Sequence, residues 1–452
     1  MRTIDPTSGR KIKNYPEFSL AKIEGILEKT QKSFMSWRKQ SVNARAVFMK
    51  RAAKILRSNK EQYARLMALE MGKPFDQGIN EIEKCALVCD FYVEHAAKYL
   101  SDKYIKTQAS KSFIAYEPLG IVLAVMPWNF PFWQVFRCAI PTLMAGNAVV
   151  LKHASNVGGC ALAIEKVFKE AGLPPFLFSN IYLSGSRVKN VIQHPFIQAV
   201  SLTGSTAAGK SIAATAGAEI KKVVLELGGS DPYIVLEDAD INQAVITCVN
   251  ARMINGGQSC VAAKRFIIVA SRFKEFEEKF VSRMQLQQMG PPLHEGITLG
   301  PMARHDLRDQ LHAQVQQSVK QGAKILLGGI IPPGPGAFYP ATVLSHVHPG
   351  MVAFRQELFG PVAALIKAKD EVEAVKMAND TVFGLGAALF TKNLAKAQHL
   401  AKEIQAGSLF INEAVRSDPY LPFGGIKQSG YGRELSEAGI REFVNIKTIV
   451  IK

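Results

Sequence analysis

The feature that most constrains this chain is an alternation of strand-like and helix-like segments between residues 121 and 227. Short apolar runs rich in β-branched residues indicate strands at residues 121–126, 148–152, 181–183, 199–202 and 222–227. Between them lie amphipathic segments that begin near Pro131, Gly158 and Ser205. This alternation with short loops predicts a parallel sheet covered by helices on both faces. Such a doubly wound, Rossmann-like sheet binds nucleotides at the carboxyl ends of its strands.

Helical patterns precede this region, and a second α/β unit follows it. Apolar residues spaced by three to four positions predict long helices at residues 17–40, 44–71 and 77–103. The second unit runs from about Gly229 to Gly425. Its patterns predict strands at residues 233–236 and 266–270 and helices at residues 241–253, 273–288 and 305–321.

Two further segments have the alternating pattern of exposed edge strands. They are residues 111–116 and residues 445–452, at the carboxyl end of the chain. An unpaired strand edge offers a row of free backbone N–H and C=O groups to a partner. We therefore expect these two segments to pair across a subunit interface.

The composition is typical of a globular protein. The 452 residues are 48% hydrophobic and 21% charged, which is enough apolar material for two or three domains. The amino terminus has no apolar signal region, and the longest aliphatic run, residues 121–126, is too short to cross a bilayer. We expect a cytoplasmic protein with no membrane partner.

The formal charge of +17 comes from Lys and Arg residues spread along the whole chain, without a basic block or interleaved aromatic residues. This pattern predicts a basic, solvated surface that favours anionic small molecules, and no nucleic-acid partner. The six cysteines are scattered through the sequence. They form neither a disulfide scaffold nor a metal site.

Cys260 has the setting of a nucleophile. It follows Gly256 and Gly257 in a turn between the predicted helix at residues 241–253 and the strand at 266–270. Two glycines allow a reactant to approach the backbone closely. A thiol also needs electropositive surroundings and a nearby base before it becomes a reactive thiolate. The alternative is a small buried hydrophobic residue.

Two other polar residues lie at strand ends. Asn129 follows the strand at residues 121–126, where its amide can stabilise an oxyanion; alternatively, it forms a turn before a proline. Glu226 ends the strand at 222–227 among apolar residues, which should raise its pKa and suit it to act as a base. The alternative is an ordinary salt-bridged glutamate.

Residues 204–211, GSTAAGKS, fit the phosphate-loop pattern GxxxxGK[ST] and follow a predicted strand. One interpretation is a nucleotide triphosphatase, whose magnesium partner would be the acidic end, Glu237 and Asp238, of the strand-like segment 233–238. In the other, Gly204 turns the chain and Ser205 caps a helix whose backbone N–H groups face a dinucleotide pyrophosphate. Both interpretations place a phosphate at this helix.

Seven motifs then indicate a family. They are MPWNFP at 126–131, LK at 151–152, TGS at 203–205, LELGG at 225–229, GQSC at 257–260, ELFGP at 357–361 and PFGGIKQSGYGRE at 422–434. In this order and spacing the chain resembles the aldehyde dehydrogenase superfamily over nearly its whole length, with a shortened amino terminus. The resemblance makes the phosphate-loop match a coincidence.

The resemblance implies a catalytic triplet. Cys260 corresponds to the nucleophile that adds to the aldehyde, and the Asn129 side chain with the Cys260 backbone N–H holds the resulting oxyanion. Hydride then leaves for the nicotinamide. Glu226 resembles the base that activates water to hydrolyse the thioester and release a carboxylate. No metal is implied.

The resemblance also implies a cofactor site for NAD or NADP. The matching residues are Lys152, Ser155, Trp128, Gly204, Ser205, Glu357 and Phe359. Lys152 corresponds to a contact of the adenosine ribose, and Glu357 and Phe359 to contacts of the nicotinamide ribose and ring. Where strict NAD users often carry a Glu that repels a 2′-phosphate, this chain has Ser155, so NADP is allowed.

The substrate prediction rests on Arg137, the only charged residue between Pro118 and Leu151. A buried cation must be paired or must bind an anion. Arg137 matches an anchoring Arg of succinate-semialdehyde dehydrogenases, and Ser417 lies near a hydroxyl used for the same carboxylate. Where many of those enzymes carry a second Arg, this chain has Ile254, and Arg416 is a candidate replacement.

Together these patterns resemble the short bacterial succinate-semialdehyde branch. We expect NAD(P)-dependent oxidation of succinate semialdehyde to succinate, with another aliphatic aldehyde as the alternative, in a homodimer or homotetramer. The expected domains are a dinucleotide-binding domain (residues 1–105 and 119–228), an α/β catalytic domain (229–430) and a small β oligomerisation arm (106–118 and 436–452).

Overall fold

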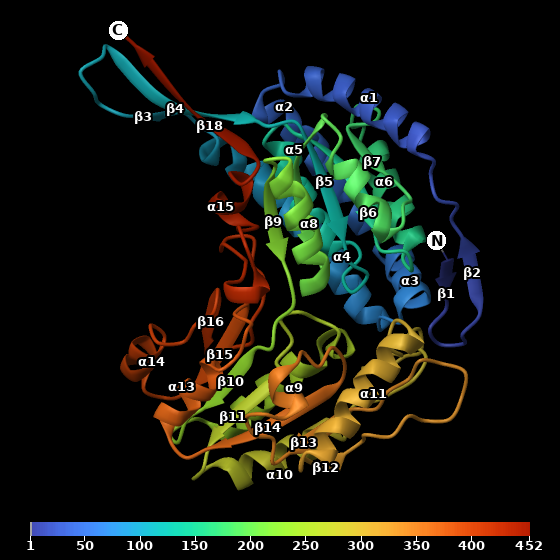
Figure 1. The fold of residues 1–452 in the computed structure, drawn as a ribbon, viewed down its shortest axis with the longest axis vertical. Helices are drawn as coiled ribbons and strands as arrows, with labels where there is room; N and C mark the ends of the chain where they lie inside the picture. Colours follow the sequence, from blue (N-terminus) through green and yellow to red (C-terminus); the bar gives the residue numbers. More distant parts are fainter. Residues whose placement is uncertain (1) are drawn as a thin grey trace.

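The computed structural model describes residues 2–452, and its centre is a six-stranded sheet in the order β17-β9-β8-β5-β6-β7 (Figure 1). Its strands are β5 (Ile121–Met126), β6 (Ala148–His153), β7 (Phe178–Asn180), β8 (Ile197–Thr203), β9 (Lys222–Glu226) and β17 (Gly430–Tyr431). β5 to β9 are parallel, whereas β17 runs antiparallel to β9. The predicted doubly wound α/β fold is confirmed.

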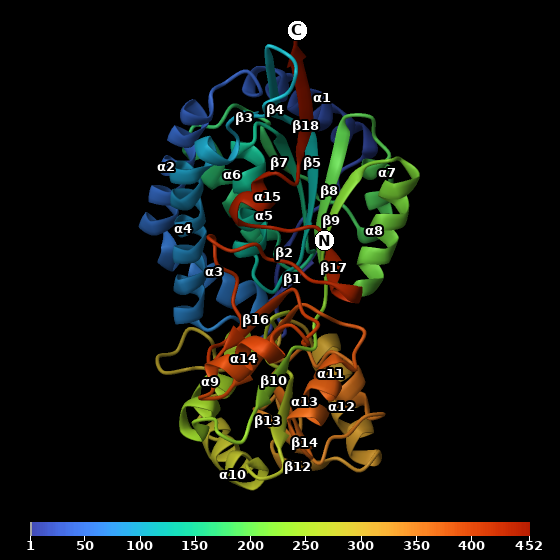
Figure 2. The ribbon, with the colours of Figure 1, turned by 90° about the vertical axis from the view of Figure 1, so that its left-hand side faces the viewer.

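Helices cover both faces of this sheet (Figure 2). They are α1 (Leu20–Trp37), α2 (Val42–Ser58), α3 (Lys60–Met71), α4 (Phe75–Tyr99), α5 (Trp133–Met144), α6 (Gly158–Glu170), α7 (Val188–Ile192), which follows the 3-10 turn η1 (Gly185–Arg187), and α8 (Thr206–Ala218). α5 and α6 pack on one face beneath α2, α3 and α4, and α8 packs on the other face against β8 and β9. α5 is buried along its whole length, which explains its lack of a polar side.

Two predictions in this region were wrong in detail. The helix expected at residues 44–71 is broken at Asn59, whose side-chain amide donates to the carbonyl of Ile55 at 2.9 Å and so competes with helix continuation. The strand expected at 181–183 lies earlier, at Phe178–Asn180. Ser179 and Asn180 break the apolar run there, although both are buried in the ladder with β6.

The second sheet has seven strands in the order β12-β13-β14-β11-β10-β15-β16. They are β10 (Pro232–Val235), β11 (Arg265–Val269), β12 (Lys324–Leu327), β13 (Thr342–Ser345), β14 (Val362–Ala368), β15 (Gly386–Phe390) and β16 (Ser408–Ile411). All neighbouring pairs are parallel except β12 with β13. The sequence predicted only β10 and β11.

Helices lie on both faces of this second sheet as well, with a hydrophobic core under each layer. They are α9 (Ile241–Met253), α10 (Phe273–Met284), α11 (His305–Lys320), α12 (Val352–Arg355), α13 (Glu371–Asn379) and α14 (Leu394–Leu400). Short helical turns follow at η2 (Ile254–Gly257), η3 (Lys427–Ser429) and α15 (Ser436–Ile440). The carboxyl-terminal ends of the parallel strands of the first sheet face the amino-terminal ends of β10, β11 and β14 at the middle of the molecule (Figure 1).

A three-stranded arm projects from the first sheet (Figure 1). β18 (Val444–Ile451) pairs antiparallel with β4 (Lys111–Pro118), from Val444 opposite Pro118 to Ile451 opposite Lys111, and β3 (Lys103–Tyr104) completes it. The expectation that these two segments pair across a subunit interface is therefore wrong for this pair. The chain returns beside β4, so each strand supplies the other's hydrogen bonds within one subunit.

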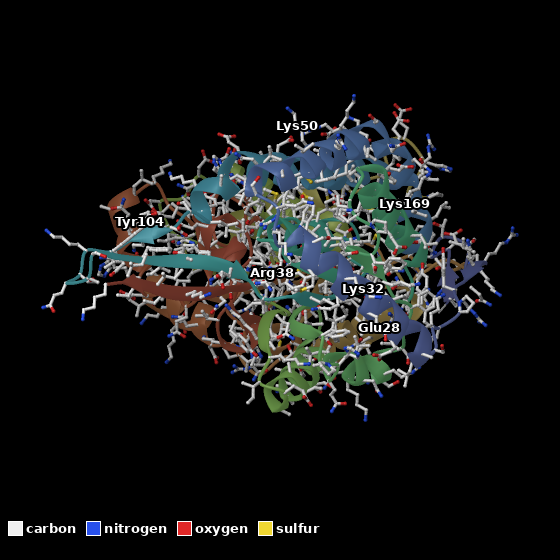
Figure 3. All side chains as sticks on the ribbon, turned by 90° about the horizontal axis from the view of Figure 1, so that it is seen from above. Glu28, Lys32, Arg38, Lys50, Tyr104 and Lys169 are labelled. Atoms are coloured by element: carbon white, nitrogen blue, oxygen red, sulfur yellow. The ribbon has the colours of Figure 1, made fainter. Side chains whose placement is uncertain are left out.

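The amino-terminal residues form a separate hairpin of β1 (Arg2–Ile4) and β2 (Lys11–Asn14). Basic side chains such as Lys50 and Lys169 are exposed on the outer helices (Figure 3). Across residues 2–452, none of the helices combines the length and the apolar composition needed to span a lipid bilayer.

Candidate active site

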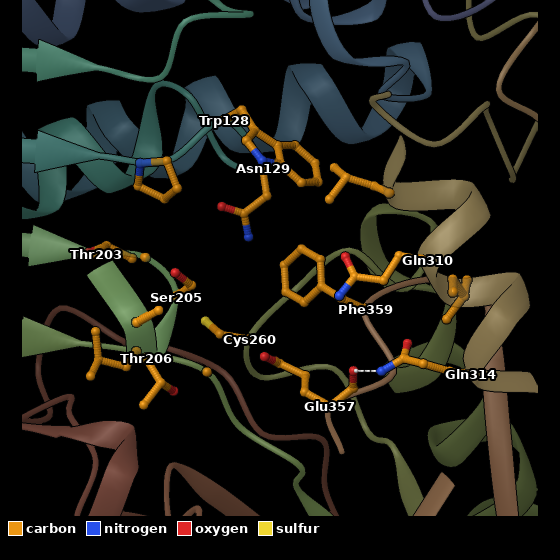
Figure 4. A pocket seen from close by; sticks show the side chains of 17 residues that line it. Trp128, Asn129, Thr203, Ser205, Thr206, Cys260, Gln310, Gln314, Glu357 and Phe359 are labelled. Atoms are coloured by element: carbon orange, nitrogen blue, oxygen red, sulfur yellow. Dashed lines mark hydrogen bonds between the residues drawn. The ribbon is translucent and has the colours of Figure 1, made fainter. Parts of the chain in front are cut away.

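A cavity of about 430 Å³ lies where the two sheets meet (Figure 4). The first sheet contributes the residues after β5, β8 and β9, including Asn129 and Ser205. The second α/β unit contributes Cys260, the first turns of α11, and Glu357 with Phe359. Segments far apart in the sequence therefore meet at the carboxyl edge of the first sheet, where a doubly wound fold binds its ligand.

Cys260 reaches this cavity from a tightly folded loop. Asn255, Gly256 and Gly257 have φ angles of 53°, 60° and 75°, in the left-handed region. A Cβ on Gly257 would lie 2.2 Å from the carbonyl oxygen of Gly360, so only glycine fits there. The loop thus packs against the ELFGP segment with no room for a side chain.

Lys264 holds the same loop from beneath. Its buried ammonium donates to the carbonyls of Ser259, Cys260 and Ala262 at 3.0, 2.8 and 3.2 Å. It also lies 3.3 Å from a carboxylate oxygen of Glu357. Lys264 was not among the predicted site residues, although a lysine directly before a buried strand is an unusual position that can be read from the sequence.

Burial raises the pKa of the Cys260 thiol to about 11, while the positive charges of Arg137 and Lys264 act in the opposite direction. The thiol is therefore protonated at neutral pH in this state. Arg137 and Lys264 supply the electropositive surroundings that a reactive thiolate requires.

Asn129 lies beside Cys260 in the cavity (Figure 4). Its side-chain amide donates to the carbonyl of Gln258 at 3.1 Å. Its own backbone carbonyl accepts from Lys73 at 2.9 Å and from the Asn255 amide at 2.8 Å. Because an amide NH₂ group has two hydrogens, the contact with Gln258 leaves one for an oxyanion.

A buried ion pair supports this segment from α4. Lys73 pairs with Glu81, and a Glu81 oxygen accepts from the backbone N–H groups of Phe132 and Trp133 at 2.9 Å each. The carboxylate thus satisfies N–H groups at the start of α5. This pair was not predicted, although Glu81 falls within the apolar stripe of an amphipathic helix, where a charge needs a partner.

Glu226 ends β9 and is 2% exposed. Burial raises its pKa well above the usual value, and Arg137 partly opposes that shift. Neither carboxylate oxygen has a hydrogen-bond partner among residues 2–452. Glu226 directly precedes Leu227 and Gly228, which line the cavity, and is a carboxyl group suited to accept a proton.

The start of α8 lines the cavity through Gly204, Ser205 and the two residues that follow. The Ser205 side chain accepts from the N–H of Ala208 at 3.3 Å, which confirms the predicted cap. β8 ends at Thr203 and α8 begins at Thr206, so the Gly-Lys-Ser of the phosphate-loop pattern lies inside the helix.

The phosphate-loop interpretation fails for a second reason. Asp238, its candidate magnesium partner, accepts from the Thr391 hydroxyl and from the backbone N–H groups of Lys392 and Asn393 in the second α/β unit. A loop that cradles phosphates needs several free residues between strand and helix, and a carboxylate near them. Only Gly204 and Ser205 lie between β8 and α8, so this loop is too short to cradle phosphates, and Asp238 is engaged elsewhere.

The remaining cofactor candidates lie around the same edge. Trp128 packs edge-on against Phe359 with ring centroids 5.8 Å apart, and Glu357 accepts from the Gly229 N–H at 3.1 Å. Lys152, half-buried at the end of β6, has a pKa lowered by burial. Ser155 is exposed just beyond it. Neither of these two lines the cavity.

The neighbouring His153 is buried, with its ring nitrogens 3.2 and 2.9 Å from the carbonyls of Met126 and Pro131. Burial lowers its pKa to about 4, so it is neutral at physiological pH.

The two predicted substrate residues do not contact each other directly. Arg137 is 1% exposed, pairs with Glu434 and lies 4.7 Å from the ring centroid of Phe423. Ser417 instead accepts a hydrogen bond from Lys84 at 2.8 Å. Arg416, the candidate replacement cation, points to solvent and pairs with Glu413 at 3.1 Å. Arg137 therefore already has an anion.

Comparisons with known proteins agree with this geometry. Residues 1–449 match the Aldehyde dehydrogenase family. The chain is 48% identical over 449 residues to a probable NADP(+) succinate-semialdehyde dehydrogenase of Synechocystis sp., covering 99% of each chain. It is 46% identical over 447 residues to the NAD(P)+ succinate semialdehyde dehydrogenase Sad of Escherichia coli. That match covers 99% of this chain and 97% of the relative. The structure is also similar to the crystal structure of succinic semialdehyde dehydrogenase from Streptococcus pyogenes with NADP+. The two share a TM-score of 0.97 and 35% identity, and the match covers 100% of this chain and 99% of that one.

Proposed function

Because this chain belongs to the aldehyde dehydrogenase family, we propose that it oxidises succinate semialdehyde to succinate with NADP or NAD. The observation that carries the proposal is the meeting of Cys260 and Asn129 in one cavity with the start of α8. That arrangement places a nucleophile, an oxyanion donor and a phosphate-binding helix terminus at a single site.

The cavity suits a nicotinamide dinucleotide. The N–H groups of the first turn of α8 suit a pyrophosphate, and the aromatic Phe359 and Trp128 provide a wall. A Cβ on Gly228 would lie 2.4 Å from a Glu357 oxygen, so the absence of a side chain leaves that carboxylate beside the cavity. When bound, the cofactor accepts the hydride that the substrate carbon releases.

Cys260 begins the reaction by attacking the aldehyde carbon as a thiolate. Arg137 and Lys264 favour loss of the thiol proton, because their charges oppose the effect of burial. The carbonyl oxygen becomes an alkoxide, which accepts a hydrogen bond from the Asn129 amide and from the Cys260 N–H. Loss of hydride converts the thiohemiacetal into a thioester.

Glu226 acts after hydride transfer. Its raised pKa makes it a strong base once it is ionised, and it takes a proton from the water that attacks the thioester carbon. The thiolate of Cys260 leaves and the carboxylate product is released.

Cofactor preference follows from Ser155. This position carries no carboxylate that would repel a 2′-phosphate, and Lys152 provides a cation three residues earlier. We propose that NADP is accepted.

We also retain the expectation of a homodimer or homotetramer, with the exposed edge of β18 in the arm as the surface that pairs subunits.

The test is the absorbance of reduced nicotinamide when the purified protein meets succinate semialdehyde or butyraldehyde, each with NAD and with NADP. Turnover of the semialdehyde that is lost in Cys260→Ala supports the proposal. Equal turnover of the two aldehydes would retain the chemistry and reject the substrate. No turnover with any pair would reject the activity.

A further inference from the structure

The charge of Arg137 is already compensated. Its guanidinium pairs with the buried carboxylate of Glu434, and a second nitrogen donates to the Thr203 hydroxyl at 3.4 Å. Breaking a buried ion pair to bind a new anion would leave Glu434 buried without its partner. Arg137 therefore offers a substrate carboxylate a charge that is already balanced, whereas a cation without a carboxylate partner would offer a full charge.

Lys84 on α4 is such a cation. Its ammonium lies 2.8 Å from the Ser417 hydroxyl and 4.4 Å from the ring centroid of Trp133, one turn beyond the segment that carries Asn129. Within residues 2–452, no carboxylate lies at ion-pairing distance from it. A lysine ammonium has three hydrogens, and Ser417 uses one of them.

The surroundings of Lys84 favour an anion. The charged and titratable groups whose fields reach it are Arg137 of α5, Asp418 of the loop after β16, and Glu81 and Cys85 of its own helix. Asp418 already accepts from the N–H of Tyr420 at 2.9 Å, and Glu81 is paired with Lys73. Burial, followed by the charge of Arg137, lowers the pKa of Lys84 to about 8.

We propose that Lys84, together with the Ser417 hydroxyl, binds the distal carboxylate of the substrate and selects ω-carboxylated aldehydes. This inference rests on the proposed function and deepens it. Ile254 has no charge to offer, and Arg416 points to solvent, so Lys84 takes the place of the second cation. The contacts with Ser417 and Trp133 hold the Lys84 ammonium in place.

The test compares succinate semialdehyde with butyraldehyde, which lacks the carboxylate, in the wild type and in Lys84→Met and Lys84→Arg. Methionine keeps the length and removes the charge. Losing a hydrogen-bonded charge corresponds to about a ten- to hundredfold rise in KM for the semialdehyde. KM for butyraldehyde stays unchanged, and Lys84→Arg recovers most of the affinity.

The matched control is Lys98→Met, which removes an exposed lysine from the same helix. It should change neither KM. An equal change for both aldehydes in Lys84→Met, or no change for either, overturns the role of Lys84. Failure of the wild type to prefer the semialdehyde is a different result, because it rejects the substrate class itself.

A measurement on the wild type makes the outcome independent of the folding of a variant. Succinate should inhibit butyraldehyde oxidation, because it carries the same distal carboxylate. Its inhibition constant should rise about tenfold for each pH unit above about 8, as Lys84 loses its proton. An inhibition constant that stays flat from pH 7 to about 9.5 overturns the proposal.

Discussion

The amide of Asn129 donates to the carbonyl of Gln258 at 3.1 Å, and this bond joins the end of a strand in the first sheet to the loop that carries Cys260. The Asn255 amide donates to the carbonyls of both Asn129 and Gln258, at 2.8 and 3.0 Å. Nucleophile and oxyanion donor therefore belong to different sheets but share one hydrogen-bond network. The geometry needed for the first chemical step depends on both halves.

Replacing Asn129 with alanine removes the oxyanion donor. We expect kcat to fall about a hundred- to thousandfold, since the donor acts mainly on the developing alkoxide. Steady-state rates with succinate semialdehyde measure this. Binding of NADP, followed by protein fluorescence, should be unchanged. A kcat within about threefold of wild type would exclude the amide from this role.

Replacing Glu226 with glutamine should separate hydride transfer from hydrolysis. A rapid burst of reduced cofactor is expected, followed by a steady rate lower by about a hundred- to ten-thousandfold, because the thioester lacks its base. Mass spectrometry of the quenched enzyme should show the acyl group on Cys260. The absence of a burst would place Glu226 before hydride transfer.

The wild-type rate should also depend on the ionisation of Glu226. Burial raises its pKa, and only the ionised carboxylate accepts a proton, so the hydrolytic rate should fall as the pH drops through that raised value. The pH profile of the steady-state rate measures this. The slow rate of Glu226→Gln should show no such fall at low pH; a profile identical to wild type would assign the titration elsewhere.

The buried Lys73–Glu81 pair should matter for stability. In Glu81→Gln the Lys73 charge loses its partner, and we expect the free energy of unfolding to fall by about 3 kcal/mol. Chemical denaturation measures it. The control is Glu83→Gln, two residues away on α4, which removes the solvent-accessible pairs with Lys60 and Arg57 and should cost less than about 1 kcal/mol. Equal effects would contradict the role of burial.

Ser155→Glu should discriminate against NADP. A carboxylate beside the 2′-phosphate repels it, and we expect KM for NADP to rise about tenfold or more while KM for NAD changes little. Ser155→Gln is the matched control, because it has the same size without the charge. If both substitutions raise KM for NADP equally, then bulk rather than charge is responsible, and the 2′-phosphate does not lie at this position.

The sequence by itself determined the parts of this protein that local pattern controls. The alternation of residues 121–227 predicted the parallel sheet, Ser205 predicted the helix cap, and residues 241–253 were predicted as a helix with its observed limits. These features depend on neighbours within a few residues, where periodicity and hydrogen-bonding capacity act directly. The ordered motifs likewise indicated the family.

Only the tertiary structure decided which charges are paired. Arg137 and Glu434, and Lys84 and Ser417, are about three hundred residues apart in the chain. No local periodicity relates such positions, because their contact exists only after both sheets have formed. The same holds for β4 and β18, whose edges were expected to need another subunit but satisfy each other once the chain returns. Long-range packing sets where buried charges find partners, and here it gives Lys84 a hydroxyl group but, within residues 2–452, no carboxylate.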